Sequence, residues 1–160
     1  RYGGSFENRV RYLLEVVDAV RSEWPEDKPL FVRISCTDWM EGGWGLEDSV
    51  KLAQLLKAGG KVDLIDCSRG GGDPPQRIEP KPGYQVPFAA AIRARAGIAT
   101  GAVGLISKPE MAEEILAGGQ ADIIVMARAF LNDPYWPLHA AKVLEAKIDW
   151  PKQYERGDIF

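Results

Sequence analysis

The chain has 160 residues, of which 46% are hydrophobic and 27% charged, and this composition favours one folded domain over a disordered chain. Its net charge is −3 and its basic residues are scattered, so we expect no nucleic-acid partner. No apolar run approaches the roughly 20 residues that span a bilayer, and we expect no membrane association. Cys36 and Cys67 show neither metal-ligand spacing nor a disulfide framework, which predicts reduced thiols in a cytoplasmic protein.

Helical and strand-like patterns alternate along the chain. Apolar residues at helical spacing predict a first helix over 6–23, with Ser5 as its N-cap. A short apolar run at 30–35, with Arg33 inside it, predicts the first strand. Further strands are expected at 62–67, 98–102 and 121–126, and further helices at 46–58, 86–96, 109–117 and 134–146. The predicted order is therefore a helix followed by four βα units.

Strict βα alternation with apolar strands predicts an α/β fold with a parallel sheet covered by helices. Periodicity does not separate four units of a barrel from a small doubly wound sheet, and both stay open at this point. A complete (β/α)8 barrel takes about 250 residues, so a barrel interpretation makes this chain only part of one.

Ligands in βα folds bind at the carboxyl ends of the strands. Residues 100–104 (TGAVG) follow this rule: small residues there let backbone N–H groups approach an anion. Arg128 lies at the end of the next strand, where a guanidinium group binds phosphate well. Together they predict a phosphate site; the simpler alternatives are a tight turn and a surface arginine.

Arg33 is a charged residue inside an apolar strand, and burial of its charge requires a partner. One candidate partner is an anionic cofactor atom, such as the pyrimidine edge of a reduced flavin, and the other is Asp66. Arg69 with 70–72 is either the mouth of a pocket or an ordinary loop. His139 has neither a nucleophile nor a metal set near it in the sequence, and we expect a structural role.

Several segments resemble the Old Yellow Enzyme family of flavin-dependent ene-reductases. YGGSFENR at 2–9 resembles the family's YGGSxENR signature, and PKQYERG at 151–157 is similar to the tail of its thermophilic-like subgroup. FVRIS, TGAVG and VMAR resemble the fifth, seventh and eighth strands of the family barrel. The resemblance implies the C-terminal half of a TIM (β/α)8 barrel, with the half-barrel over 1–148 and a tail over 149–160.

The resemblance also implies an FMN-dependent oxidoreductase in which NAD(P)H is the reductant and activated C=C bonds, as in enones and related α,β-unsaturated compounds, are reduced. Arg33 would contact the pyrimidine edge of the flavin and stabilise charge there, and Ser68 would lie close to the cofactor. Arg156 would match a tail arginine that reaches a neighbouring subunit's site, so we expect an oligomer. The remaining cofactor-binding residues would be Gly101, Val103, Gly104, Ala127 and Arg128.

Two departures from the family pattern bear on this function. Ala127 replaces the family's usual glycine before the phosphate arginine, and its methyl group could narrow the approach to the backbone. The family's paired His (or His/Asn) residues and tyrosine proton donor lie upstream of the YGGS segment, so a complementary N-terminal half-barrel or another copy is expected as a partner. The alternatives are a non-catalytic half-barrel that binds flavin or phosphate and self-associates, and a different flavin or phosphate barrel, against which YGGSFENR and QYERG argue.

Overall fold

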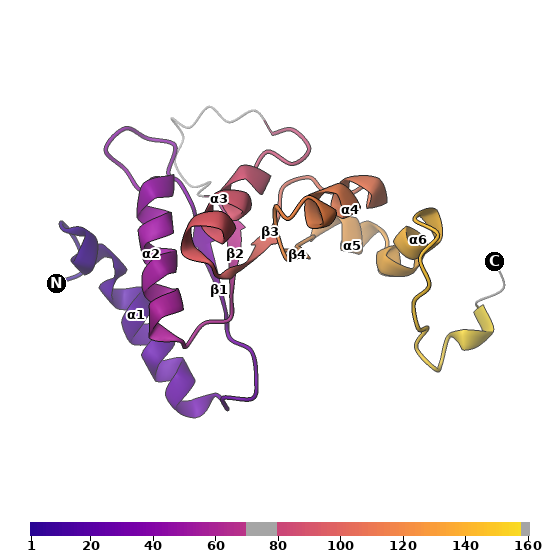
Figure 1. Ribbon diagram of the computed structural model, residues 1–160, viewed down its shortest axis with the longest axis horizontal. Helices are drawn as coiled ribbons and strands as arrows, with labels where there is room; N and C mark the ends of the chain where they lie inside the picture. The colour runs from indigo at the N-terminus through magenta and orange to yellow at the C-terminus, as the bar shows by residue number, and fades with distance from the viewer. Residues whose placement is uncertain (70–79, 158–160) are drawn as a thin grey trace.

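The chain alternates between strands and helices and builds a four-stranded sheet (Figure 1). The computed structural model describes residues 1–69 and 80–157. The strands are β1 (Phe31–Ser35), β2 (Leu64–Ser68), β3 (Ala99–Ala102) and β4 (Ile123–Ile124). The helices are α1 (Phe6–Glu23), α2 (Leu46–Gly59), α3 (Val86–Ala96), α4 (Pro109–Ala117), α5 (Arg128–Asn132), α6 (Trp136–Val143) and a 3-10 turn, η1 (Glu155–Gly157).

The strands are all parallel and lie in the sheet in the order of the sequence, β1-β2-β3-β4. A doubly wound sheet reverses its strand order at a switch point, whereas a barrel adds each strand beside the last. The predicted parallel α/β fold is therefore confirmed, and of the two architectures left open the strand order favours part of a barrel.

The two faces of the sheet differ in burial. In β1, Val32 and Ile34 are buried on the face that the helices cover. Phe31, Arg33 and Ser35 alternate with them and are exposed on the other face. In a closed barrel this second face is the interior, so here the inner face of a half-barrel is open to solvent.

The hydrophobic core lies between the helix-covered face of the sheet and helices α2 and α3. Its largest fully buried side chains include Ile65 on β2, Ile92 on α3 and Val50 on α2. Helix α3 packs on both β2 and β3 and against α2. The strands are therefore held against a layer of helices.

The first turn of α1 and its N-cap connect that helix to the loop after β1. Ser5 is the N-cap, as predicted, and its hydroxyl accepts a hydrogen bond from the backbone N–H of Asn8 at 3.4 Å. Phe6 stacks on Trp44 with ring centroids 6.0 Å apart. The guanidinium of Arg9 lies 5.4 Å from the centroid of the same Trp44 ring. The YGGSFENR segment thus has a structural role that is visible within this chain.

The structure corrects the prediction in two places near the end of the chain. The strand predicted at 121–126 is shorter, Ile123–Ile124, and the backbone N–H groups of Asp122 and Val125 on either side of it donate to Thr100 and Ala102 of β3. The helix predicted at 134–146 is shorter, Trp136–Val143, and the unpredicted helix α5 precedes it. The break has a local cause: Asp133 precedes Pro134 and is extended, with φ −141° and ψ 92°.

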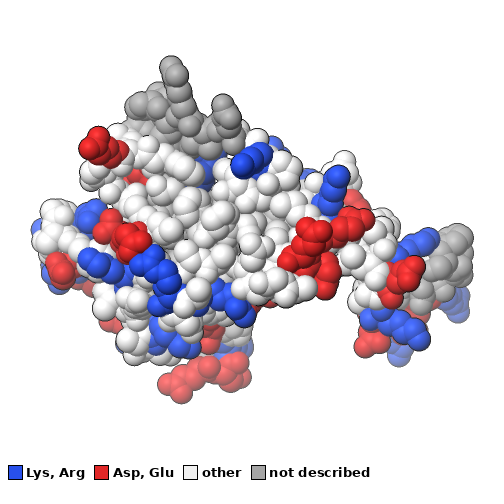
Figure 2. Space-filling model, turned by 45° about the horizontal axis from the view of Figure 1, so that its top comes forward, with Lys and Arg blue, Asp and Glu red and all other residues white. Residues whose placement is uncertain are grey.

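Three global properties bear on the function classes considered above. Cys36 and Cys67 are buried free thiols. Over residues 1–69 and 80–157, no helix is long and apolar enough to cross a membrane. On the face drawn in Figure 2, Lys and Arg are interspersed with Asp and Glu around a broad uncharged area, so neither sign of charge dominates that face.

Candidate phosphate and flavin site

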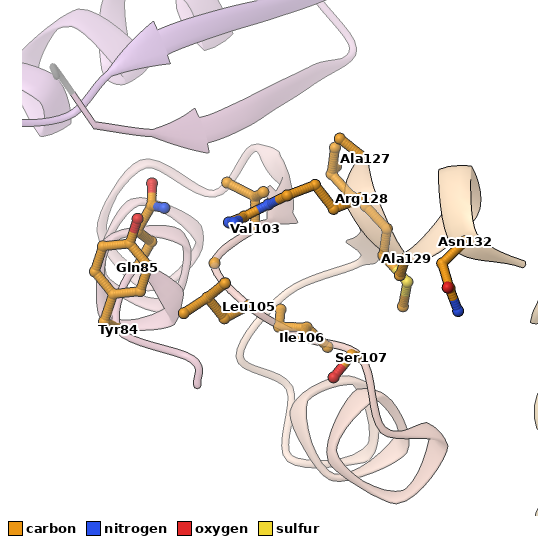
Figure 3. Close-up of a pocket in the computed structure, with 13 residues that line it drawn as sticks. Tyr84, Gln85, Val103, Leu105, Ile106, Ser107, Ala127, Arg128, Ala129 and Asn132 are labelled. Carbon is orange, nitrogen blue, oxygen red and sulfur yellow. The ribbon is translucent and has the colours of Figure 1, made fainter. Parts of the chain in front are cut away.

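A cavity of about 380 Å³ opens at the carboxyl ends of β3 and β4. Its walls come from the loop after β3, from the start of α5 after β4, and from Tyr84 and Gln85, which precede α3 (Figure 3). Val103, Gly104, Ala127 and Arg128 all line it. The structure therefore brings together four of the residues predicted to bind the cofactor.

The loop after β3 has an unusual backbone conformation. Gly104 has φ +128°, and Leu105, which follows it, has φ 55°. A Cβ at position 104 would lie 3.2 Å from the ring of Tyr84, so both the conformation and the space require glycine there. The left-handed conformation of Leu105 costs about 1 kcal/mol or more, and such strain persists mainly where the surroundings or a function demand it.

Arg128 is the first residue of α5 and is exposed at the cavity. In Figure 3 its side chain extends from the β4 side toward Val103. Within the described part of the chain, no carboxylate forms an ion pair with this guanidinium. Ala127 has φ −120°, a value that any residue adopts, so its methyl group introduces no backbone strain.

A second cluster lies on the open inner face of the sheet, around Arg33. Its Nη1 donates to Asp66 Oδ2 at 2.9 Å, and its Nη2 donates to Ser68 Oγ at 3.0 Å. The expectation that the strand buries the charge of Arg33 is wrong: its side chain is 56% exposed, because it points to the uncovered face. Of its two candidate partners, the ion pair with Asp66 is present.

Asp66 is the more buried member of this pair, with a side chain 16% exposed. Burial raises the pKa of Asp66 above its ordinary value, and the nearby Arg33 guanidinium partly offsets that rise. Its second oxygen, Oδ1, is buried and has no hydrogen-bond donor among the described residues. The guanidinium of Arg33 is therefore oriented by a carboxylate that depends on it for charge compensation.

Gly101 lies in the same cross-sheet row as this pair. Arg33 is in register with Asp66, Asp66 with Gly101, and Gly101 with Ile123. A Cβ at Gly101 would come within 3.0 Å of the side chain of Val125, so glycine lets that neighbour pack across the inner face. Gly101 is not among the residues that line the cavity.

The other predicted residues lie elsewhere. Arg156 is in η1, at the yellow end of the ribbon, far from both clusters (Figure 1). Arg69 donates through Nε to the hydroxyl of Tyr84 at 3.1 Å, so it contacts a cavity residue, whereas 70–72 lie outside the described residues. His139 is an exposed side chain whose Nδ1 lies 2.6 Å from Asp133 Oδ2.

Tyr84 and Gln85 are cavity residues that reasoning from the sequence missed. They precede α3, and in a βα fold the residues before a helix lie at the same edge as the strand ends. That position, together with a polar residue at the start of an apolar helix, was the available signal. Helix α3 is separated by a long loop from β2, so the sequence did not indicate that its first turn returns to β3.

The arrangement suits an anionic, phosphate-bearing ligand. Donors available for the anion are the backbone around Gly104, the guanidinium of Arg128 and the carboxamide of Gln85. Over the described residues, no group of three or more His, Cys, Asp or Glu side chains is arranged to hold a metal ion.

Comparison with known sequences gives a consistent family. Residues 1–147 match the NADH:flavin oxidoreductase / NADH oxidase family. The NADPH dehydrogenase of Geobacillus thermodenitrificans is 53% identical over 156 residues, which is 98% of this chain and 45% of that protein. The NADPH dehydrogenase of Bacillus subtilis is 49% identical over 159 residues, with the same coverage. The chain thus spans a little under half the length of these relatives.

Solved structures with a similar fold are TIM-barrel enzymes, which confirms the half-barrel architecture. Morphinone reductase in complex with tetrahydroNAD superposes with a TM-score of 0.64 at 24% identity, over 94% of this chain and 38% of that one. The 6-hydroxypseudooxynicotine amine oxidase of Pseudomonas geniculata superposes with a TM-score of 0.72 at 26% identity, over 90% of this chain and 22% of that one.

Proposed function

The chain belongs to the NADH:flavin oxidoreductase / NADH oxidase family, and we propose that it supplies the FMN-phosphate half of the active site of an FMN-dependent NAD(P)H oxidoreductase. One observation carries this proposal. The cavity at the ends of β3 and β4 combines Arg128, whose guanidinium has no carboxylate partner among the described residues, with the backbone of Gly104.

The residues present fit the phosphate end of FMN. A phosphate monoester requires several hydrogen-bond donors and a positive charge, which Arg128 and the loop at Gly104 provide. The strained Leu105 is a further reason to assign a function to this loop. The predicted roles of Val103 and Ala127 rest on their place in the same cavity wall.

Arg33 is the candidate for the flavin-ring end of the site. Because Asp66 and Ser68 hold its guanidinium on the inner face of the sheet, it would present its remaining N–H groups to the pyrimidine edge of the ring. Its positive charge would stabilise negative charge that develops at that edge. Bound FMN would supply the redox chemistry, hydride transfer from NAD(P)H to the β-carbon of an activated alkene.

The finer parts of the proposal come from the resemblance to ene-reductases. They are activated C=C compounds as substrates, a complementary N-terminal half-barrel that brings the substrate-binding His pair and tyrosine, and a role for Arg156 in a neighbouring subunit. The proposed boundary between half-barrel and tail, at 148 and 149, has the same origin. A cytoplasmic location completes the proposal, supported by the two free thiols.

The test is FMN binding by this chain fused behind the N-terminal part of the Geobacillus thermodenitrificans relative that it does not cover. We expect a yellow fusion protein that is reduced by NADPH. Arg128→Ala should weaken FMN binding about 10- to 100-fold, because it removes charge-assisted hydrogen bonds to the phosphate. Arg11→Ala, on the exposed surface of α1, is the matched control and should bind FMN normally. A well-folded fusion without flavin absorbance would contradict the proposal.

The alternative is a non-catalytic half-barrel that self-associates, and a specific observation favours it. Phe31 and Ile123 are 53% and 37% exposed, and both belong to the strands at the edges of the sheet. Open edges and apolar surface promote association. A stable homodimer of the chain, with no flavin-dependent NADPH oxidation by itself or in the fusion, would support this alternative against the first proposal.

A further inference from the structure

Gln85 is a polar residue buried at the cavity wall without a complete set of partners. It is only 5% exposed. It occupies the N-cap position of α3, but its side chain makes no capping hydrogen bond. Its carbonyl oxygen, Oε1, is buried and has no hydrogen-bond donor within the described part of the chain. An unsatisfied buried polar atom costs about 1–3 kcal/mol, and most such atoms in folded proteins are paired.

The position of Gln85 connects it to the phosphate loop. The backbone N–H of Gly83 donates to the carbonyl of Gly104 at 2.7 Å, which joins the turn before α3 to the loop after β3. A Cβ at Gly104 would lie 3.3 Å from the Cβ of Gln85. Gln85 therefore lies directly behind the glycine whose backbone faces the cavity.

Figure 3 places Gln85 and Arg128 on opposite walls of the same cavity. The Gln85 side chain lies on the α3 side of the cavity, and the Arg128 side chain extends from the β4 side toward Val103, with the cavity space between them. A ligand in that space would meet a carboxamide on one wall and a guanidinium on the other.

A carboxamide carries two N–H donors and one acceptor, and a half-turn about its terminal bond exchanges them. It can therefore donate to an oxygen of a phosphate ester, or accept from a neighbouring hydroxyl of the ligand, without adding charge. Glutamate at this position would repel the anion, and an apolar residue would offer it nothing.

We propose that Gln85 is a further binding residue for the phosphate-ester end of FMN, opposite Arg128. This inference rests on the proposed function. Among the described residues no acceptor pairs with the side-chain N–H groups of Gln85, so bound phosphate would accept a hydrogen bond from them, whereas the sealed Oε1 keeps its cost. Gln85 thus lowers the stability of the ligand-free fold and increases the affinity for the phosphorylated flavin.

The test compares FMN with riboflavin, which lacks the phosphate, by quenching of flavin fluorescence in the fusion protein described above. Gln85→Met is close in volume and removes only the polar atoms. We expect it to weaken FMN binding about tenfold and riboflavin binding less than about twofold. Gln85→Glu should weaken FMN binding further through charge repulsion. Gln54→Leu, an exposed glutamine on α2, is the matched control and should change neither affinity.

The ligand-free melting temperature separates binding from a purely structural role. We expect Gln85→Met to melt at the same temperature as the unmodified protein or higher, because an unpaired buried amide is removed. A lower melting temperature with equal losses of FMN and riboflavin affinity would overturn the inference, and so would unchanged FMN affinity. If both Arg128→Ala and Gln85→Met leave the ratio of FMN to riboflavin affinity unchanged, the proposed phosphate site is wrong. If only Gln85→Met leaves that ratio unchanged, the phosphate site stands and only the role of Gln85 is wrong.

Discussion

Replacing Arg33 by Met tests how the inner face of the half-barrel compensates its charges. The substitution keeps an unbranched, apolar stem but removes the guanidinium that lies 2.9 Å from Asp66. Asp66 would then be a largely buried carboxylate with its charge unbalanced, since its side chain is only 16% exposed. We expect the chain to lose stability at neutral pH and to recover it as Asp66 takes up a proton.

The magnitude follows from the distance and the exposure. Two unit charges 4 Å apart interact by about 4 kcal/mol at an effective dielectric constant near 20. Because the Arg33 side chain is 56% exposed, water screens the pair and its side-chain entropy is partly lost on pairing. A reduction of about 1–2 kcal/mol in the free energy of unfolding is therefore expected near neutral pH.

The pH dependence has a definite sign. Burial raises the pKa of folded Asp66 above its unfolded value, so the folded chain holds this proton more tightly. The stability that this proton contributes is complete below the unfolded pKa and is lost as pH rises through the folded pKa. Without Arg33 the folded pKa rises further, and the loss extends to higher pH. The difference between the two proteins should be small near the ordinary pKa of an aspartate, about 4, and largest near neutrality.

The measurement is urea unfolding of the 160-residue chain from about pH 4 to pH 8. Asp66→Asn in the Arg33→Met background should abolish the pH dependence of the difference, because it removes the titrating carboxylate. Arg95→Met is the control. Arg95 pairs with the exposed Glu47 and lowers the pKa of that carboxyl. The loss of unfolding free energy in this variant should therefore stay small and develop only in the acidic range, as Glu47 ionises. A deficit for Arg33→Met that is equal at both ends of the range would refute the electrostatic explanation.

Two further substitutions test other features of the fold and site. Thr100→Val should raise the free energy of unfolding by about 1 kcal/mol, since the Thr100 hydroxyl is fully buried and has no partner among the described residues. The control, Thr37→Val, should lower the free energy of unfolding, because the Thr37 hydroxyl accepts a backbone hydrogen bond. Equal losses of stability for both variants in thermal melting would contradict this prediction. Gly104→Ala should lower the free energy of unfolding by about 1–3 kcal/mol and reduce FMN affinity in the fusion protein, because φ +128° disfavours alanine and its Cβ would crowd the ring of Tyr84. The control, Gly45→Ala, has free space and a negative φ. Equal FMN affinities for the two alanine variants would show that the loop at Gly104 tolerates a side chain.

Most of the secondary structure followed from local patterns in the sequence. The bounds of α1 and α3 agree with prediction because apolar spacing, an N-cap at Ser5 and glycine at the end of α3 act over one or two helical turns. The predictions for β4 and the last helix were less accurate. The extent of β4 depends on its pairing with another strand, which local patterns do not show. The break between α5 and α6 depends on the extended residue before Pro134, and the apolar spacing on both sides of Pro134 gave no sign of that break.

The candidate site was only partly accessible from the sequence. The TGAVG segment and Arg128 could be assigned to one edge because carboxyl ends of adjacent parallel strands must meet there. Gln85 could not, since its place behind Gly104 results from the return of the chain after a long loop and from the hydrogen bond between Gly83 and Gly104.

The sequence by itself therefore determined the alternation of helices and strands, the two segments proposed to bind an anion and the family resemblance, all of which reside in short stretches of contiguous residues. Periodicity left a barrel and a doubly wound sheet open, and the strand order of the tertiary structure favours the barrel that the resemblance implied, because strand order is a property of packing. The tertiary structure also decided the state of Arg33. Alternation along β1 fixes which face its side chain is on, but the exposure of that face, and the choice of Asp66 and Ser68 as partners, depend on which surfaces other elements cover.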